Sequence, residues 1–136
     1  MGASGWNYVT PWLGSPQRSL DALHREVFTA EEWDEEYASL EELRSDGEFM
    51  GTRGTHSVLD LTGAGDGARD DIRPLPPQRL LERFGTERPT VEQYALAAAG
   101  SPGLHAELHG RWTGRYVLLH TDGEPTHVGF FGVSGD

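Results

Sequence analysis

The stretch RYVLLHTDGEPTHVGFF, residues 115–131, carries the clearest fold signal in the chain. Two runs rich in aliphatic and aromatic residues, 115–120 and 126–131, flank Asp122-Gly123, a pair that favours a tight two-residue turn. The pattern predicts a β-hairpin. Because an isolated hairpin is at best marginally stable in water, we expect further strands and helices to cover its apolar sides.

Helix signals precede the hairpin. Ser15-Pro16 is an N-cap followed by a proline at the first helical position, and apolar residues then recur at helical spacing, which predicts a helix over 16–28. A capping-box spacing at Ser39 predicts a short helix to about residue 46, ended by Gly47. Two more helices are predicted from proline starts, a terminal glycine and the capping box at Thr90: residues 76–85 and the segment that follows Thr90.

Two further strands are expected. Residues 6–10 are aromatic and β-branched and precede Pro11, as is typical of an edge strand. Residues 55–61 alternate in polarity and are interpreted as a strand, on which His56 and Asp60 lie too far apart for a direct hydrogen bond. The glycine- and aspartate-rich residues 62–71 are interpreted as a surface loop.

Together these elements predict one α+β domain that spans residues 1–136. We expect a small antiparallel sheet that contains the C-terminal hairpin, with three or four short helices. The helix at 16–28 and the two helices between residues 76 and 100 are expected on one side of this sheet.

Composition excludes several classes of function. The chain has 136 residues, no cysteine and a net charge of −11, and all eleven of its basic residues are arginine. Without cysteine it has no disulfide framework, thiolate nucleophile or cysteine-ligated metal. No stretch approaches the length of a membrane span, and the negative charge disfavours nucleic acid, so we expect a cytoplasmic protein that binds neither membranes nor nucleic acid.

Nine of the 22 acidic residues lie in one stretch, residues 31–48, in which Arg44 is the only base. One interpretation is a solvated face that keeps the protein soluble. The functional interpretation is a non-enzymatic module, of the immunity, antitoxin or escort type, that docks a basic protein. Its expected partner-binding residues are Glu31, Glu32, Asp34, Glu35, Glu36, Glu41 and Glu42.

The alternative is a small enzyme or ligand-binding domain with a pocket beside the hairpin. In a hairpin turning at Asp122-Gly123, His120 pairs with Pro125, which makes His120 and His127 diagonal neighbours on one face. The candidate ligand-binding residues are His56, Arg115, Tyr116, His120 and His127. The sequence assigns no catalytic residue and no cofactor, and it leaves enzymatic activity and oligomeric state open.

Two other groups of residues could form a binding site. The pairs His105/His109 and His120/His127 have spacings that a metal site could use, but the first pair lacks the zinc-protease motif, and we assign no metal. Arg111 and Arg115, with Trp112 and Tyr116, could receive an anionic ligand or a partner's carboxylates. The alternative for this second set is the ordinary wet face of a hairpin.

Three segments carry a resemblance to a known family: residues 54–60, residues 84–90 and the ending from residue 114 to residue 132. On these segments, together with the aromatic start at Trp6-Asn7-Tyr8, the chain resembles a family of small actinobacterial proteins of uncharacterised function. The resemblance implies a complete, cytoplasmic, single-domain protein and transfers no functional residues. Residues 62–71 and the histidines at 105 and 109 depart from the family's pattern.

Overall fold

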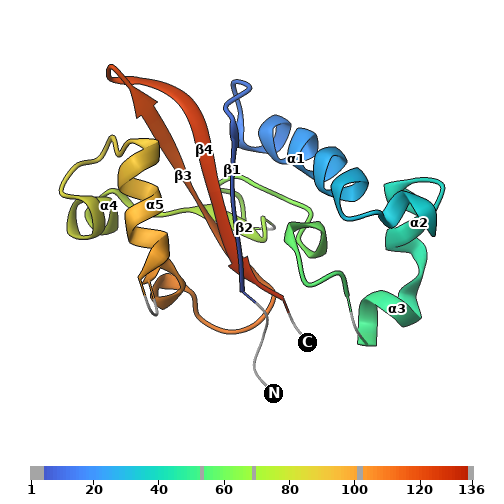
Figure 1. Ribbon diagram of the computed structural model, residues 1–136. Helices are drawn as coiled ribbons and strands as arrows, with labels where there is room; N and C mark the ends of the chain where they lie inside the picture. The colour runs from blue at the N-terminus through green and yellow to red at the C-terminus, as the bar shows by residue number, and fades with distance from the viewer. Residues whose placement is uncertain (1–4, 53, 69, 101–102, 135–136) are drawn as a thin grey trace.

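The computed structural model describes residues 5–52, 54–68, 70–100 and 103–134, and is built around a four-stranded mixed sheet (Figure 1). The strands are β1 (Gly5–Pro11), β2 (Ile72–Pro74), β3 (Thr113–Thr121) and β4 (Glu124–Val133), in the order β1-β4-β3-β2. β4 pairs antiparallel with both β1 and β3, whereas β2 runs parallel to β3. The predicted α+β class, the hairpin and the edge strand are confirmed. The short strand β2 was not predicted, and it makes the sheet mixed instead of purely antiparallel.

The hairpin turns at Asp122 and Gly123, whose φ angles of 53° and 80° are those of the expected tight turn. His120 pairs with Pro125 as predicted, but Leu119 pairs with His127, so the register shifts between Leu119 and His120. Paired residues share a face and consecutive residues alternate. His127 therefore lies on the face of Leu119, opposite to His120, and the prediction that the two histidines are neighbours on one face is wrong.

The described residues form five α-helices, and four of them were predicted: the three longest and the short helix after Ser39. In helix α1 (Pro16–Ala30) the Ser15 side chain accepts a hydrogen bond from the Arg18 N–H, as an N-cap does. α4 (Pro77–Phe84) ends at Gly85 in the left-handed conformation, and α5 (Val91–Ala99) begins with a complete capping box at Thr90. The others are α2 (Leu40–Ser45) and α3 (Gly47–Thr52), with three 3₁₀ helices, η1 (Trp33–Glu35), η2 (Val58–Asp60) and η3 (Gly103–Glu107).

Two local predictions are wrong. Gly47 was expected to end the short helix after Ser39, but it begins α3. The Asp46 carboxylate accepts a hydrogen bond from the Phe49 N–H and so caps this new helix. Residues 55–61 are not a strand: Ser57 caps η2, and His56 has a φ of 55°.

Hydrogen bonds to Asp60 explain why residues 55–61 do not form an extended strand. The Asp60 carboxylate accepts hydrogen bonds from the backbone N–H groups of Thr55 and His56, at 2.7 and 3.1 Å. Side-chain bonds of this kind compete with a strand's ladder and fold the backbone back on itself. Asp60 and His56 are thus hydrogen-bonded through the His56 backbone, contrary to the separation expected for a strand.

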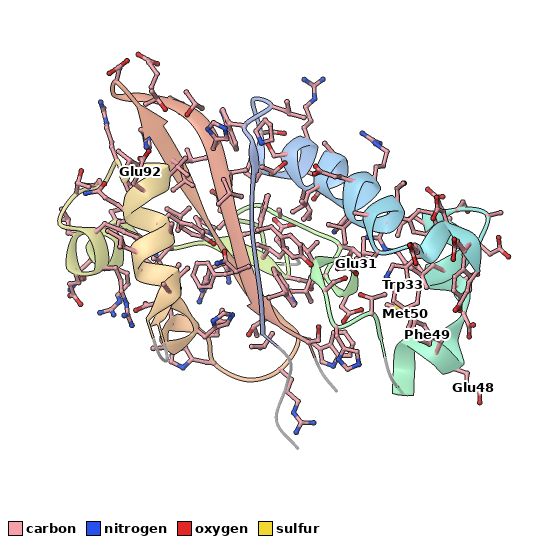
Figure 2. The ribbon with its side chains drawn as sticks, in the orientation of Figure 1. Glu31, Trp33, Glu48, Phe49, Met50 and Glu92 are labelled. Carbon is pink, nitrogen blue, oxygen red and sulfur yellow. The ribbon has the colours of Figure 1, made fainter. Side chains whose placement is uncertain are left out.

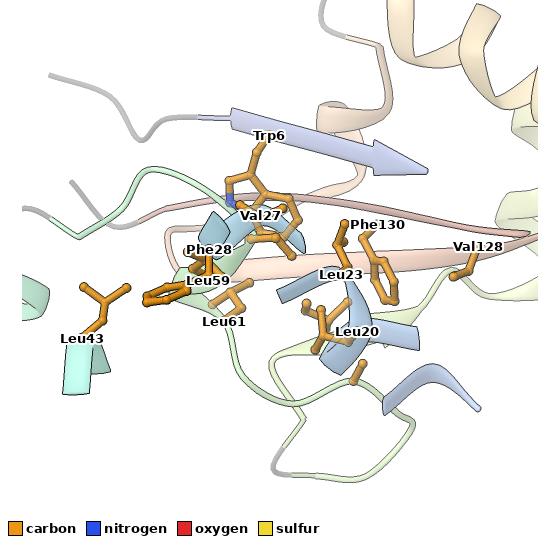
Figure 3. Packing of buried hydrophobic residues seen from close by; sticks show 13 residues of the cluster. Trp6, Leu20, Leu23, Val27, Phe28, Leu43, Leu59, Leu61, Val128 and Phe130 are labelled. Carbon is orange, nitrogen blue, oxygen red and sulfur yellow. The ribbon is translucent and has the colours of Figure 1, made fainter. Parts of the chain in front are cut away.

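The helices cover both faces of the sheet, and the expectation that all three long helices lie on one side is wrong. Figure 1 shows α1 on one side of the strands, with α4 and α5 on the other. The core on the α1 face consists of Trp6, Leu20, Leu23, Val27, Phe28, Leu43, Val58, Leu59, Leu61, Ala64, Ile72, Val128 and Phe130 (Figure 3). The core on the α5 face consists of Leu75, Tyr94, Leu104, Val117, Leu119 and Phe131. Since neighbouring residues of a strand point to opposite faces, the consecutive Phe130 and Phe131 supply one aromatic ring to each core.

No helix within the described ranges is both long enough and apolar enough to cross a membrane.

Candidate functional site

We call residues 31–50 the acidic lobe. It follows α1, contains η1, α2 and most of α3, and lies at the side of the molecule away from α4 and α5 (Figure 1). The seven carboxylates predicted to bind a partner, from Glu31 to Glu42, are all exposed. None of them forms an ion pair with another residue that the structure describes. The lobe therefore presents to solvent seven carboxylates that form no ion pair with any described residue.

A small aromatic cluster underlies these carboxylates. The rings of Trp33 and Tyr37 pack against Phe49, with centroids 5.5 and 6.5 Å apart, and all three side chains are half-buried. Figure 2 shows Trp33, Phe49 and Met50 gathered beside Glu31 and Glu48. The Trp33 Nε1–H donates to the Glu31 carboxylate at 3.2 Å. This aromatic packing joins η1 to α3, so the carboxylates of the lobe are carried by a folded segment.

Arg44, the only base of the lobe, is turned toward the protein interior. Its Nη2 lies 3.0 Å from Nδ1 of His24 on α1, and the His24 Nε2 lies 3.1 Å from the Val58 carbonyl oxygen. Burial, followed by the charge of Arg44, lowers the pKa of His24 to about 4, so the imidazole is neutral at pH 7. Neutral His24 donates from Nε2 to Val58 and accepts at Nδ1 from Arg44. We call these two hydrogen bonds the His24 lock; they hold half-buried Arg44, the one local base of the lobe, toward α1.

A groove of about 570 Å³ runs beside this lock, between α1 and α2. Its lining includes Phe28 and Leu40 together with Asp21, Arg25 and Glu41. His24 and Arg44 line it too, so the groove combines apolar groups with charges of both signs, and it borders the acidic lobe.

The five residues of the alternative pocket are divided among different places. Only Tyr116 and His120 share a pocket, a slot of about 330 Å³ at the edge of β3 beyond the end of β2. Leu75, Leu80 and Arg88 are among its other lining residues. Burial, followed by the charges of Asp66 and Asp70, raises the pKa of Tyr116, which favours the neutral phenol. His120 Nδ1 is buried and has no hydrogen-bond partner among the described atoms.

The other three residues lie elsewhere. Arg115 alternates with Tyr116 along β3 and lines two hollows on the α5 side. His127 faces away from His120, and His56 is exposed in the loop before η2. The single pocket proposed from the sequence is therefore not assembled.

The histidines at 105 and 109 also separate. His105 lies in η3, where its Nε2 is 3.3 Å from the Trp6 carbonyl oxygen and its ring meets the edge of Phe131. His109 is exposed and lines the same hollows as Arg115. Within the described ranges, no three or more histidine, aspartate or glutamate side chains converge in a geometry that would hold a metal ion.

One charged cluster was missed by the sequence analysis. Glu107 is buried at the end of η3, where Arg79 binds it through Nε and Nη2 at 2.8 and 2.5 Å, and Arg83 binds it through Nε at 2.6 Å. These hydrogen bonds lower the pKa of Glu107 to about 2 and raise that of Arg79. The spacing of the two arginines on one helix places them on the same face. Nothing local identifies Glu107, 24 residues beyond Arg83, as their partner.

Comparison of the chain with known protein families, with curated proteins and with solved structures finds no match. The resemblance to the actinobacterial family remains a prediction.

Proposed function

We propose that this protein is a non-enzymatic binding module whose acidic lobe docks a basic protein in the cytoplasm, as immunity, antitoxin or escort proteins do. One observation carries the proposal. Seven exposed carboxylates form no ion pair with any described residue, while the only base of the lobe, Arg44, is bonded inward to His24.

Charge and apolar surface have different parts in such docking. A patch of one sign attracts an opposite patch over roughly a Debye length, about 8 Å at physiological salt, and so speeds association and selects for basic partners. Durable binding needs buried anchors, which are most often aromatic side chains or arginine. Half-buried Trp33, Tyr37 and Phe49 supply the aromatic surface at the centre of the charged lobe.

The test compares two charge reversals of equal size. In the first variant Glu35, Glu36 and Glu41 become arginine. Glu42 is left intact because its carboxylate accepts the Ala38 N–H ahead of α2. In the control, exposed Glu87, Glu92 and Glu124, none of them in the lobe, become arginine.

Tagged wild type and both variants are used to capture partners from lysate of the source organism at low and moderate salt, and the affinity for each captured protein is then measured. We expect a stoichiometric basic protein that binds the wild type and the control but not the lobe variant, and whose binding weakens with salt. Unchanged affinity in the lobe variant would overturn the proposal.

A second candidate function is favoured by the slot that joins Tyr116 and His120 beside the hairpin. Its apolar walls and the unpartnered His120 Nδ1 suit a small ligand, bound with or without chemistry. Replacing His120 with glutamine should abolish binding in the slot and leave docking at the lobe unchanged. Loss of docking in His120→Gln would contradict this assignment of the two functions to separate places.

A further inference from the structure

Two arginines stand side by side on the sheet without a carboxylate partner. Arg73 of β2 and Arg115 of β3 are directly paired in the register, so their side chains leave the sheet on the same face. Like charges in this position repel each other and destabilise a sheet. Neither guanidinium forms an ion pair with any residue that the structure describes.

Two carboxylates that line the same hollow accept hydrogen bonds from backbone groups. Asp70 accepts the Gly67 N–H at 2.9 Å, and Asp71 accepts the Thr62 N–H at 3.3 Å. Both aspartates line the same hollow as the two arginines. The Arg73 Nη2 donates to the Asp66 backbone carbonyl at 3.5 Å, a single acceptor, so neither guanidinium has a bidentate acceptor among the described residues.

The same hollow contains a strained tryptophan. Trp112 has a φ of 57°, a left-handed conformation that bulky side chains rarely adopt, and it is 40% exposed. Strain of this kind persists where the surrounding structure imposes it, and it concentrates at functional sites. Trp112, His109, Arg73 and Arg115 together line a hollow of about 270 Å³. His109 and Arg115 also line an adjoining hollow of about 390 Å³ over Glu107.

We propose that this hollow binds a small organic anion that carries a planar ring. The two guanidinium forks receive the oxygens of its carboxylate or phosphate, which arginine pairs bind in a bidentate manner. The indole of Trp112 stacks on the ring, and His109 adds a hydrogen bond at the rim. The second carboxylate oxygens of Asp70 and Asp71 accept ligand hydroxyl groups. This site lies outside the acidic lobe, and neither docking nor its failure affects the proposal.

Titration calorimetry with three probes tests the site: adenosine monophosphate, benzoate and inorganic phosphate. We expect saturable binding of at least one ring-bearing anion below about 1 mM, within the affinity range of small ligands. Inorganic phosphate should bind at least about tenfold more weakly, because it lacks the ring that stacks on Trp112. A preference between the two ring-bearing probes identifies phosphate or carboxylate as the natural group.

Two double variants give the matched comparison. Arg73→Gln with Arg115→Gln should abolish binding, whereas Arg18→Gln with Arg88→Gln, which removes the same charge elsewhere, should retain it. The proposal is overturned if neither ring-bearing anion binds the wild type, or if the first double variant binds as tightly as the wild type.

A third variant separates ligand binding from a structural role of the tryptophan. Glycine adopts the left-handed conformation of residue 112 without strain, so Trp112→Gly keeps the backbone of the hollow and removes the indole. The affinity for the ring-bearing anion should fall to that of inorganic phosphate. Unchanged affinity in this variant would contradict the assigned role of Trp112.

Discussion

On each face of the sheet one buried titratable side chain binds arginine, and we call each such set of hydrogen bonds a lock. The buried side chain is neutral in one lock and charged in the other. On the α1 face the lock is neutral His24, which holds the inward-turned Arg44. On the α5 face it is an ionised carboxylate, Glu107, held by Arg79 and Arg83. Each lock therefore fixes where arginine charges lie on its own side of the sheet.

The difference shows how one acidic chain can offer two unlike surfaces. The His24 lock holds Arg44 toward α1, and the carboxylates of the acidic lobe stay exposed, which suits long-range attraction. Glu107 binds Arg79 and Arg83 on the α5 side, where Arg73 and Arg115 line a hollow and form no ion pair with any described residue. A hollow with fixed donors suits a small ligand, whereas an exposed charged surface suits a macromolecule.

The largest expected effects come from two glycines of β4 that point to opposite faces. A Cβ at Gly132 would overlap the Trp6 ring on the α1 face, and a Cβ at Gly129 would overlap the Tyr94 ring on the α5 face. We expect Gly132→Ala and Gly129→Ala each to lower the free energy of unfolding by about 3 kcal/mol, as overpacking does. Urea denaturation measures the loss. Gly47→Ala is the control because a Cβ there meets no atom within 4 Å, and equal stability of all three variants would refute the packing on both faces.

Acid should weaken the α1 face first. The pKa of His24 is about 4 in the folded protein against 6.5 as its ordinary value, so the unfolded chain binds the proton more readily between these values. The stabilisation is thus complete above about pH 6.5 and is lost as the pH falls toward 4. The total is about 3 kcal/mol. Urea denaturation across this range should show a slope in the wild type that is flattened in His24→Gln, and equal slopes would contradict the buried neutral imidazole.

The α5 face should respond in a lower pH window. The pKa of Glu107 falls from an ordinary 4.5 to about 2, so its stabilisation is present above pH 4.5 and is lost as the pH falls toward 2. At pH 7 we expect Glu107→Gln to cost about 2 kcal/mol of unfolding free energy, because hydrogen bonds from two arginines lose their charged acceptor. The cost should shrink below pH 4.5.

A matched variant separates this effect from general charge removal. Glu82→Gln removes a carboxylate that Arg79 also binds but that is half-exposed, so it should cost less than about 0.5 kcal/mol. An equal loss of unfolding free energy in the two variants would contradict a stabilising role of the buried Glu107 carboxylate.

A smaller difference is expected between two tyrosines on opposite faces. On the α5 face the Tyr94 hydroxyl donates to the Asn7 side chain at 2.6 Å, whereas on the α1 face the Tyr8 hydroxyl approaches exposed Glu31 at 3.4 Å. Tyr94→Phe should therefore cost about 1 kcal/mol and Tyr8→Phe nearly nothing. Thermal unfolding of both variants provides the measurement, and a larger loss for Tyr8→Phe would reverse the assignment.

Much of the fold could be predicted from local signals. Caps, prolines and terminal glycines located α1, α4 and α5, and Asp122-Gly123 located the hairpin turn, because each signal acts within a few residues. Residues 55–61 alternate in polarity as a strand does, but Thr55, Ser57 and Asp60 form hydrogen bonds with nearby backbone and side-chain groups, which prevents an extended strand. β2 has only three residues, too few for a periodic pattern.

The candidate site was predictable to a similar extent. The exposed carboxylates of the acidic lobe follow from composition, because so many charges in one stretch cannot be buried. The pocket residues were dispersed because the register shift at His120 and the alternation of Arg115 with Tyr116 send their side chains to different faces. A turn alone does not reveal such a shift.

The sequence by itself determined the helix ends, the hairpin and the acidic stretch, since these depend on neighbours along the chain. Only the tertiary structure decided that Arg44 turns inward to His24, that Glu107 receives two arginines of α4 and that Arg73 stands beside Arg115. Those contacts join segments 20 to 42 residues apart, and they depend on the strand order and on which face each helix covers. Local propensity carries no information about either, because both are set by how the two cores bury their apolar surface.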